Sequence, residues 1–186
     1  AWALNVPSIT LFGSTPGYRN TYITNINRII ESSSEVNPYK IDKNDFSIKD
    51  IKVSDIVKTI RDADAVVHLG AIVGDPASEI DPSNTISINL HSTKIVADVC
   101  KFYNINRFIF ASTCSVYGKS DGSEGITEEA PMNPVSLYAA TKKSDEVITE
   151  CYSHSFNMKC IGLRFFTVYG PWGRPDMATF IFTKRI

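Results

Sequence analysis

The sequence has little of what marks a nucleic-acid-binding or membrane protein. Its 186 residues include 19 Lys and Arg against 20 Asp and Glu, so the formal net charge is −1. This balance gives no reason to expect nucleic acid or an anionic membrane as a partner. No apolar run approaches the length that spans a bilayer, and no basic region followed by an apolar core opens the chain. We therefore expect a cytoplasmic protein of one domain, or of one domain and a fragment.

Histidine and cysteine are also scarce, and neither is spaced as in a metal site. The three histidines share no ligand spacing, so we expect no metal. The four cysteines lack paired metal-type spacing, which favours buried, reduced thiols. Cys114 lies inside a cluster of hydroxyl residues, but no histidine follows at a position that would suggest a nucleophile.

Short apolar runs alternate with segments of helical periodicity, which indicates βαβ units and a parallel sheet. The predicted strands cover residues 9–12, 28–31, 65–69, 107–111 and 159–166, and the predicted helices cover 53–61, 84–103 and 136–156. In the last helix we expect Ala140, Val147, Ile148 and Cys151 to face inward. We predict an α/β fold, a Rossmann-like parallel sheet with helices on both faces, atypical at its N-terminus and incomplete at its C-terminus.

Three polar side chains near one predicted strand end suggest a chemical function. Thr113 closes the apolar run 107–111, and Tyr138 and Lys142 follow four residues apart in the helical segment. Positions i and i+4 of a helix share one face, and a nearby ammonium favours the phenolate form of a tyrosine. With a hydroxyl from the strand end they would form a proton-transfer device for carbonyl–alcohol chemistry. Taken alone, the Tyr–Lys spacing also fits an ordinary exposed pair.

Several segments occur in the order found in a known family. They are Asp64–Ala71, Ile88–Thr93, Phe110–Gly118, the Tyr-x-x-x-Lys of residues 138–142, and Leu163–Ala178. Over about residues 50–186 the chain resembles the extended short-chain dehydrogenase/reductase family, specifically its NAD-dependent nucleotide-sugar epimerases and dehydratases. The segment Leu163–Ala178 closely resembles UDP-glucuronate 4-epimerases.

The resemblance implies a reaction, a cofactor and a set of site residues. It implies transient oxidation at C4 of a nucleotide sugar by NAD, with Thr113, Tyr138 and Lys142 as the catalytic residues. The implied cofactor contacts are Asp50, Ile51, Leu69, Gly70, Ala71, Asn89, Ser112, Tyr138, Lys142 and Phe165. The implied substrate contacts are Thr113, Thr167 and Arg174. Relatives often pair through the helix that bears Tyr138, so a homodimer is an expectation as well.

The N-terminal part departs from this family's pattern. Gly13 and Gly17 are four apart with Pro16 between them, and Arg19 stands where a third glycine of a phosphate-binding loop would fall. Residues 1–20 resemble the C-terminal end of a lipopolysaccharide heptosyltransferase, and that similarity extends to about residue 60.

The sequence thus predicts two parts. Residues 1–60 would be a heptosyltransferase-like segment, and residues 61–186 a Rossmann part of an epimerase or dehydratase without its substrate lobe. Two alternatives remain open at this point. The chain could be a heptosyltransferase-derived fragment, or a chimaeric, truncated domain without activity.

Overall fold

Two compact units make up the chain in the computed structural model, residues 1–60 and residues 61–186. The structure describes residues 8–12, 27–31, 52–119, 125–169 and 178–185. In the first unit, β1 (Ser8–Phe12) pairs in parallel with β2 (Asn27–Glu31), and α2 spans Val53–Ile60. These three elements agree with the predicted strands 9–12 and 28–31 and the predicted helix 53–61.

The second unit contains a parallel sheet in the order β3-β4-β5. Its strands are β3 (Val66–His68), β4 (Arg107–Thr113) and β5 (Lys159–Phe165). Its helices are α3 (Asp75–Ile80), α4 (Pro82–Ile86), the π-helical turn η3 (Ser87–His91), α5 (Ser92–Phe102), the 3₁₀ turn η4 (Cys114–Tyr117), α6 (Leu137–Phe156) and α7 (Ala178–Arg185). The predicted parallel α/β architecture is therefore confirmed.

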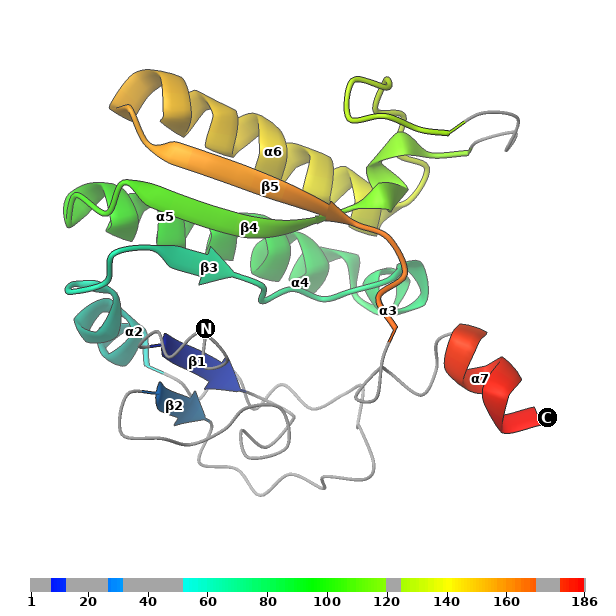
Figure 1. Cartoon of the computed structure of the whole chain (residues 1–186), viewed down its shortest axis with the longest axis horizontal. Coiled ribbons are helices and arrows are strands. Elements are labelled where there is room, and N and C mark those ends of the chain that lie inside the picture. Colours follow the sequence, from blue (N-terminus) through cyan, green and yellow to red (C-terminus); the bar gives the residue numbers. More distant parts are fainter. Residues whose placement is uncertain (1–7, 13–26, 32–51, 120–124, 170–177, 186) are drawn as a thin grey trace. The chain divides into compact units, whose positions relative to one another are not determined.

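Helices α5 and α6 lie side by side along one face of this sheet (Figure 1). The alternation of β4 explains the packing, because Phe108 and Phe110 point to that face and are buried, with ring centroids 5.9 Å apart. Ala97 and Cys100 of α5, both fully buried, belong to the same core. On the opposite face, Val67, Ile161 and Leu163 are exposed.

Local capping sets the limits of α6, which carries the central residues of the predicted site. The Ser136 hydroxyl accepts a hydrogen bond from the Ala139 amide at 3.2 Å, and the helix ends at Asn157 in the left-handed conformation (φ 53°). The chain enters β5 two residues later. Since α6 and β5 follow each other so closely, the length of the helix fixes where Tyr138 lies relative to the sheet.

Some predicted details are wrong. The predicted helix 84–103 is not uniform, because the wider η3 turn interrupts it, and α3 was not predicted at all. Cys151 and Val147, expected inside, are exposed on the outer side of α6. Apolar residues at helical spacing do not reveal which of several possible faces is buried.

Gly118 provides a test of the turn that follows η4. Its φ is +77°, and a Cβ built there would lie 2.0 Å from the backbone oxygen of Asn133. We predict that Gly118→Ala lowers the free energy of unfolding by about 2–4 kcal/mol, because it adds backbone strain to a backbone clash. Gly125→Ala, where a Cβ would meet nothing within 4 Å, should cost less than about 1 kcal/mol. Urea unfolding of both variants measures the difference, and equal costs would contradict this account.

Candidate functional site

The buried amide of Asn89 joins three segments near the carboxyl ends of the strands. Its Oδ1 accepts from the Ile72 amide at 2.7 Å, and its Nδ2 donates to the Ile72 carbonyl at 3.0 Å and to the Thr141 hydroxyl at 3.1 Å. Asn89 lies inside the π-helical turn, and such turns often occur at functional sites. The side chain thereby holds the segment after β3 against α6.

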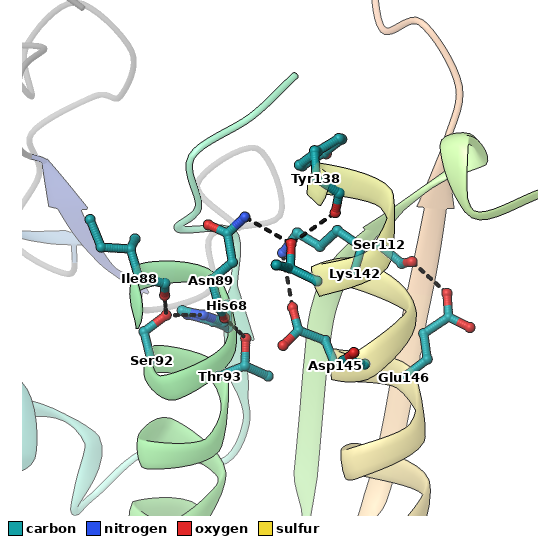
Figure 2. A network of polar contacts seen from close by, with 12 residues as sticks. His68, Ile88, Asn89, Ser92, Thr93, Ser112, Tyr138, Lys142, Asp145 and Glu146 are labelled. Carbon is teal, nitrogen blue, oxygen red and sulfur yellow. Dashed lines mark hydrogen bonds and ion pairs between the residues drawn. The ribbon is translucent and has the colours of Figure 1, made fainter. Parts of the chain in front are cut away.

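Tyr138 and Lys142 lie one turn apart on the buried side of α6, as Figure 2 shows. Tyr138 is 7% exposed and Lys142 is 2% exposed. The first turn is tied into the network, because the Thr141 hydroxyl donates to the Tyr138 carbonyl at 2.8 Å. The reading of this pair as ordinary exposed surface residues is therefore wrong.

Lys142 forms an ion pair with Asp145 inside the protein. Its Nζ donates to Asp145 Oδ2 at 3.2 Å, and the two side chains are 3% and 0% exposed. Burial raises the pKa of Asp145 to about 6, although the charge of Lys142 acts in the opposite direction. Within the described residues, Asp145 Oδ1 has no hydrogen-bond partner. The nearby Thr93 hydroxyl donates to the Asn89 carbonyl at 2.8 Å, and its proximity also lowers the pKa of the Asp145 carboxyl somewhat.

His68, at the end of β3, is held neutral beside this pair. Desolvation lowers its pKa to about 4, and the charge of Lys142 adds to the effect. Its Nε2 lies 3.4 Å from the Ser92 hydroxyl, whose own proton goes to the Ile88 carbonyl (Figure 2). The Nε2 atom must then carry the ring proton if it is to donate to Ser92 Oγ.

A second polar cluster fastens β5 to α6. Arg164 forms a forked contact with Glu146, with Nη2–Oε2 at 2.8 Å and Nε–Oε1 at 3.0 Å. Its Nη1 donates to Tyr117 Oη at 2.8 Å, and Ser112 Oγ donates to Glu146 Oε1. The hydrogen bond to Glu146 raises the pKa of Arg164 further, so its charge is permanent. Arg164 thus joins β5 to a carboxylate of α6.

Thr113 lies at the end of β4, where the strand turns into η4. Its Oγ1 accepts from the Ser115 amide at 3.2 Å and donates to Ser115 Oγ at 3.3 Å. The residue is 7% exposed, and it pairs with Phe165 across β4 and β5. The hydroxyl is thus fixed at the carboxyl edge of the sheet, where ligands bind in open parallel sheets.

The other predicted contact residues are more open, or cannot be placed. Leu69, after β3, is 59% exposed, and Phe165 is 42% exposed. Gly70 and Thr167 are exposed, while Ala71 is half-buried. Asp50, Ile51 and Arg174 lie outside the described residues, as do Gly13, Pro16, Gly17 and Arg19.

The described part of the site offers a phenol, an ammonium and a hydroxyl as polar groups, with apolar side chains around them. This set suits proton transfer to and from an alcohol beside a flat, partly apolar ligand. Sequence reasoning missed Asp145 and Glu146. The signal was present, because two acidic residues follow Lys142 at i+3 and i+4.

The described residues contain no group of three or more His, Cys, Asp or Glu side chains that could hold a metal ion. None of the helices among them combines the length and the apolar character that crossing a membrane requires.

The chain is similar to a known protein family and to several of its members. A family model described as the NAD dependent epimerase/dehydratase family matches residues 19–186. Protein CapI of Staphylococcus aureus is 42% identical over 151 residues, which are 78% of this chain and 45% of that protein. UDP-glucuronate 4-epimerase 4 of Arabidopsis thaliana is 43% identical over 122 residues, 65% of this chain and 28% of that protein.

A solved structure gives the same result for the fold. UDP-glucuronic acid 4-epimerase from Bacillus cereus, in complex with UDP-glucuronic acid and NAD, superposes with a TM-score of 0.70 at 30% identity, covering 92% of this chain and 52% of that one. This chain therefore spans about half the length of that epimerase. Because the family match starts at residue 19, it includes most of the segment compared with a heptosyltransferase, and it does not support that origin for residues 19–60.

The environment of His68 predicts a measurable titration. Its pKa in the folded protein, about 4, lies below the ordinary value of 6.5. The folded state therefore binds fewer protons than the unfolded one, and this contribution to stability is present above pH 6.5 and lost as the pH falls through 4. We expect NMR spectra to show a neutral ring down to pH 5, and Lys142→Met to raise the midpoint. A wild-type midpoint near 6.5 would contradict the described burial.

Proposed function

We propose, starting from the fact that this chain belongs to the NAD dependent epimerase/dehydratase family, that it forms the dinucleotide-binding and catalytic part of a UDP-glucuronate 4-epimerase. The observation that carries this proposal is the buried pair Tyr138 and Lys142, one turn apart on α6. The 43% identity to a plant UDP-glucuronate 4-epimerase supports the choice of sugar. The proposed partners of this chain are NAD, a nucleotide-sugar substrate and a second copy of the chain. Neither nucleic acid nor a membrane is among them.

The residues at the carboxyl edge of the sheet fit an NAD site. A buried ammonium lies at this edge, and apolar side chains remain open there, Leu69 after β3 and Phe165 at the end of β5. We assign cofactor contacts to Asp50, Ile51, Leu69, Gly70, Ala71, Asn89, Ser112, Tyr138, Lys142 and Phe165. When bound, NAD supplies reversible hydride transfer at C4 of the sugar.

The proton at C4 is handled by the chain's own side chains in this proposal. Tyr138, as phenolate, accepts the proton of the C4 hydroxyl and later returns it. The Lys142 ammonium stabilises the phenolate, and the Thr113 hydroxyl donates a hydrogen bond to the same sugar oxygen. All three residues are buried, so these interactions take place away from bulk water, where they are stronger.

We assign substrate contacts to Thr113, Thr167 and Arg174. Thr167 is exposed just beyond the end of β5, next to the apolar side chains of the proposed cofactor edge. Arg174 brings a planar guanidinium, which suits the carboxylate of a uronic acid or a phosphate oxygen. The 43% identity to a UDP-glucuronate 4-epimerase favours the carboxylate of a uronic acid as its partner.

The residues after Thr113 favour epimerisation over dehydration. Elimination of water from a sugar requires an additional base and an additional acid beside the reacting carbons. Cys114, Ser115 and Val116 follow Thr113, and none of them is a carboxylate. A 4-epimerase needs acid–base chemistry only at the C4 hydroxyl, which the proposed residues can supply, beside the hydride transfer that NAD would provide.

The outer side of α5 and α6 supports a homodimer in this proposal. Ile95 and Phe102 on α5 are 47% and 77% exposed, and Val147 on α6 is 50% exposed. Apolar side chains at two adjacent helices are typical of an interface.

The four free cysteines fit a reducing, cytoplasmic location.

Titration with NAD tests whether this chain has a working cofactor site. We expect saturable binding by calorimetry, and a loss of affinity of at least about tenfold in Lys142→Ala, because a charge-assisted contact is removed. Absence of binding at millimolar NAD would favour the alternative of an inert, truncated domain. Binding of a nucleotide heptose without NAD would instead favour a heptosyltransferase-derived fragment.

Tyr138→Phe tests the proton-transfer role separately. In protein that converts UDP-glucuronate, we expect this variant to lose activity by about 100-fold or more while it still binds NAD, because only the phenolic oxygen is removed. Tyr152→Phe is the matched control. Tyr152 lies near the other end of α6, where its hydroxyl bonds Asp98 at 2.5 Å. Equal losses in both variants, measured by NMR of the sugar, would argue against Tyr138.

Val147→Asp tests the dimer. A charge placed in an apolar interface should shift the protein to monomer in sedimentation experiments. Glu79→Ala, a change at an exposed position of α3, should leave the assembly state unchanged. A monomeric wild type would overturn the assignment of this surface.

A further inference from the structure

We propose that Asp145 is a positioning residue for Lys142, which holds the ammonium at the cofactor edge and supplies its buried counter-charge. The proposal rests on the proposed function, because it concerns the lysine assigned there to NAD. It goes beyond that function because Asp145 has no step in the proposed reaction and was not predicted from the sequence.

Burying the Lys142 ammonium costs free energy unless an anion compensates its charge. The side chain of Lys142 is only 3% exposed, and its Nζ lies 3.2 Å from Asp145 Oδ2. A buried ammonium without a compensating anion is strongly destabilised, so one of the two must move or change its charge if the other is removed. The position of Lys142 in the fold therefore depends on Asp145.

The other described polar groups around the Lys142–Asp145 pair offer Lys142 no second counter-charge. Glu146, the next acidic residue on α6, is engaged by Arg164 at 2.8 Å. His68, from β3, is neutral, and the Thr93 hydroxyl of α5 donates to the Asn89 carbonyl. Among the described residues these groups leave Asp145 as the carboxylate paired with Lys142 (Figure 2).

One oxygen of the buried Asp145 carboxylate, Oδ1, has no hydrogen-bond partner among the described residues, although most buried polar atoms have one. A carboxylate that only joined elements of the fold would be held through both oxygens, as Glu146 is held by Arg164 and Ser112. Asp145 Oδ2 accepts from Lys142 at 3.2 Å, and the Thr93 hydroxyl of α5 adds a smaller favourable effect on the charged carboxylate, so Lys142 is its charged partner.

The arrangement has a consequence for pH dependence. Burial raises the pKa of Asp145 to about 6. Below that pH the carboxyl is neutral and the ammonium loses its counter-charge, whereas above it the pair is complete. The affinity for NAD should therefore fall as the pH drops from 8 to 5, with a midpoint near 6.

Binding of NAD to three proteins tests this inference. Calorimetry at pH 8 should show Asp145→Asn weakened by about tenfold or more, because the amide keeps the shape but not the charge. The variant should also lose the pH dependence near 6. Asp98→Asn is the matched control, since Asp98 pairs with Lys94 at 2.5 Å but is 42% exposed. It should bind NAD like the wild type. An Asp145→Asn variant with wild-type affinity and pH profile would overturn the inference.

A double-mutant cycle separates positioning from a merely structural role. In a Lys142→Met background, Asp145→Asn should change NAD affinity less than twofold, because the group that it positions is gone. Equal effects in both backgrounds would overturn the proposal. If Asp145→Asn alone does not fold, the double variant should fold, since it contains no unpaired buried ammonium. A double variant that also fails to fold would count against the proposal.

The same cycle distinguishes this inference from the proposed function. If the wild type does not bind NAD at all, the proposed function fails for this chain. The coupling between residues 142 and 145 can then be read from unfolding midpoints in urea. Non-additive midpoint shifts would support the positioning role without a cofactor, and additive shifts would contradict it.

Discussion

The burial of one ammonium group constrains most of the described site. Lys142 is almost inaccessible, so the protein must provide an anion and must keep other cations away. Asp145 provides the anion, and desolvation keeps His68 uncharged. A protonated His68 would place a second positive charge near Lys142, which the lowered pKa of His68 prevents. The polar groups of β3, α5 and α6 are thus arranged around a single charge.

Helix α6 is joined to η3 by a neutral hydrogen bond and to β5 by an ion pair. Toward η3 it is joined by a neutral hydrogen bond, which Asn89 Nδ2 donates to the Thr141 hydroxyl. Toward β5 it is joined by the forked contact between Arg164 and Glu146, which requires a defined geometry. Apolar packing alone would permit small shifts of the helix along the sheet. Directional contacts at both places restrict such shifts, and the orientation of Tyr138 depends on them.

The sequence predicted the parts of this arrangement that depend on local patterns. The strands and the shared helix face of Tyr138 and Lys142 follow from periodicity and residue type. The interruption at η3 could not be predicted, because it results from how Asn89 reaches both Ile72 and Thr141, which is a tertiary contact. The role of Asp145 was missed for a similar reason. An acidic residue three positions after a lysine is usually an exposed partner, and only the fold shows that this pair is buried.

The described residues bear on the type of reaction more than on the identity of the sugar. In the proposed function the buried phenol, ammonium and hydroxyl would all act on one alcohol and its proton, and this chemistry does not depend on the rest of the substrate. Discrimination between sugars needs polar groups that are left unpaired when the wrong sugar binds. In the proposed function Thr167 and Arg174 would contribute in this way. The buried groups would then serve the reaction, while the residues that contact the sugar would be free to vary with the substrate, as is usual for loops on a rigid scaffold.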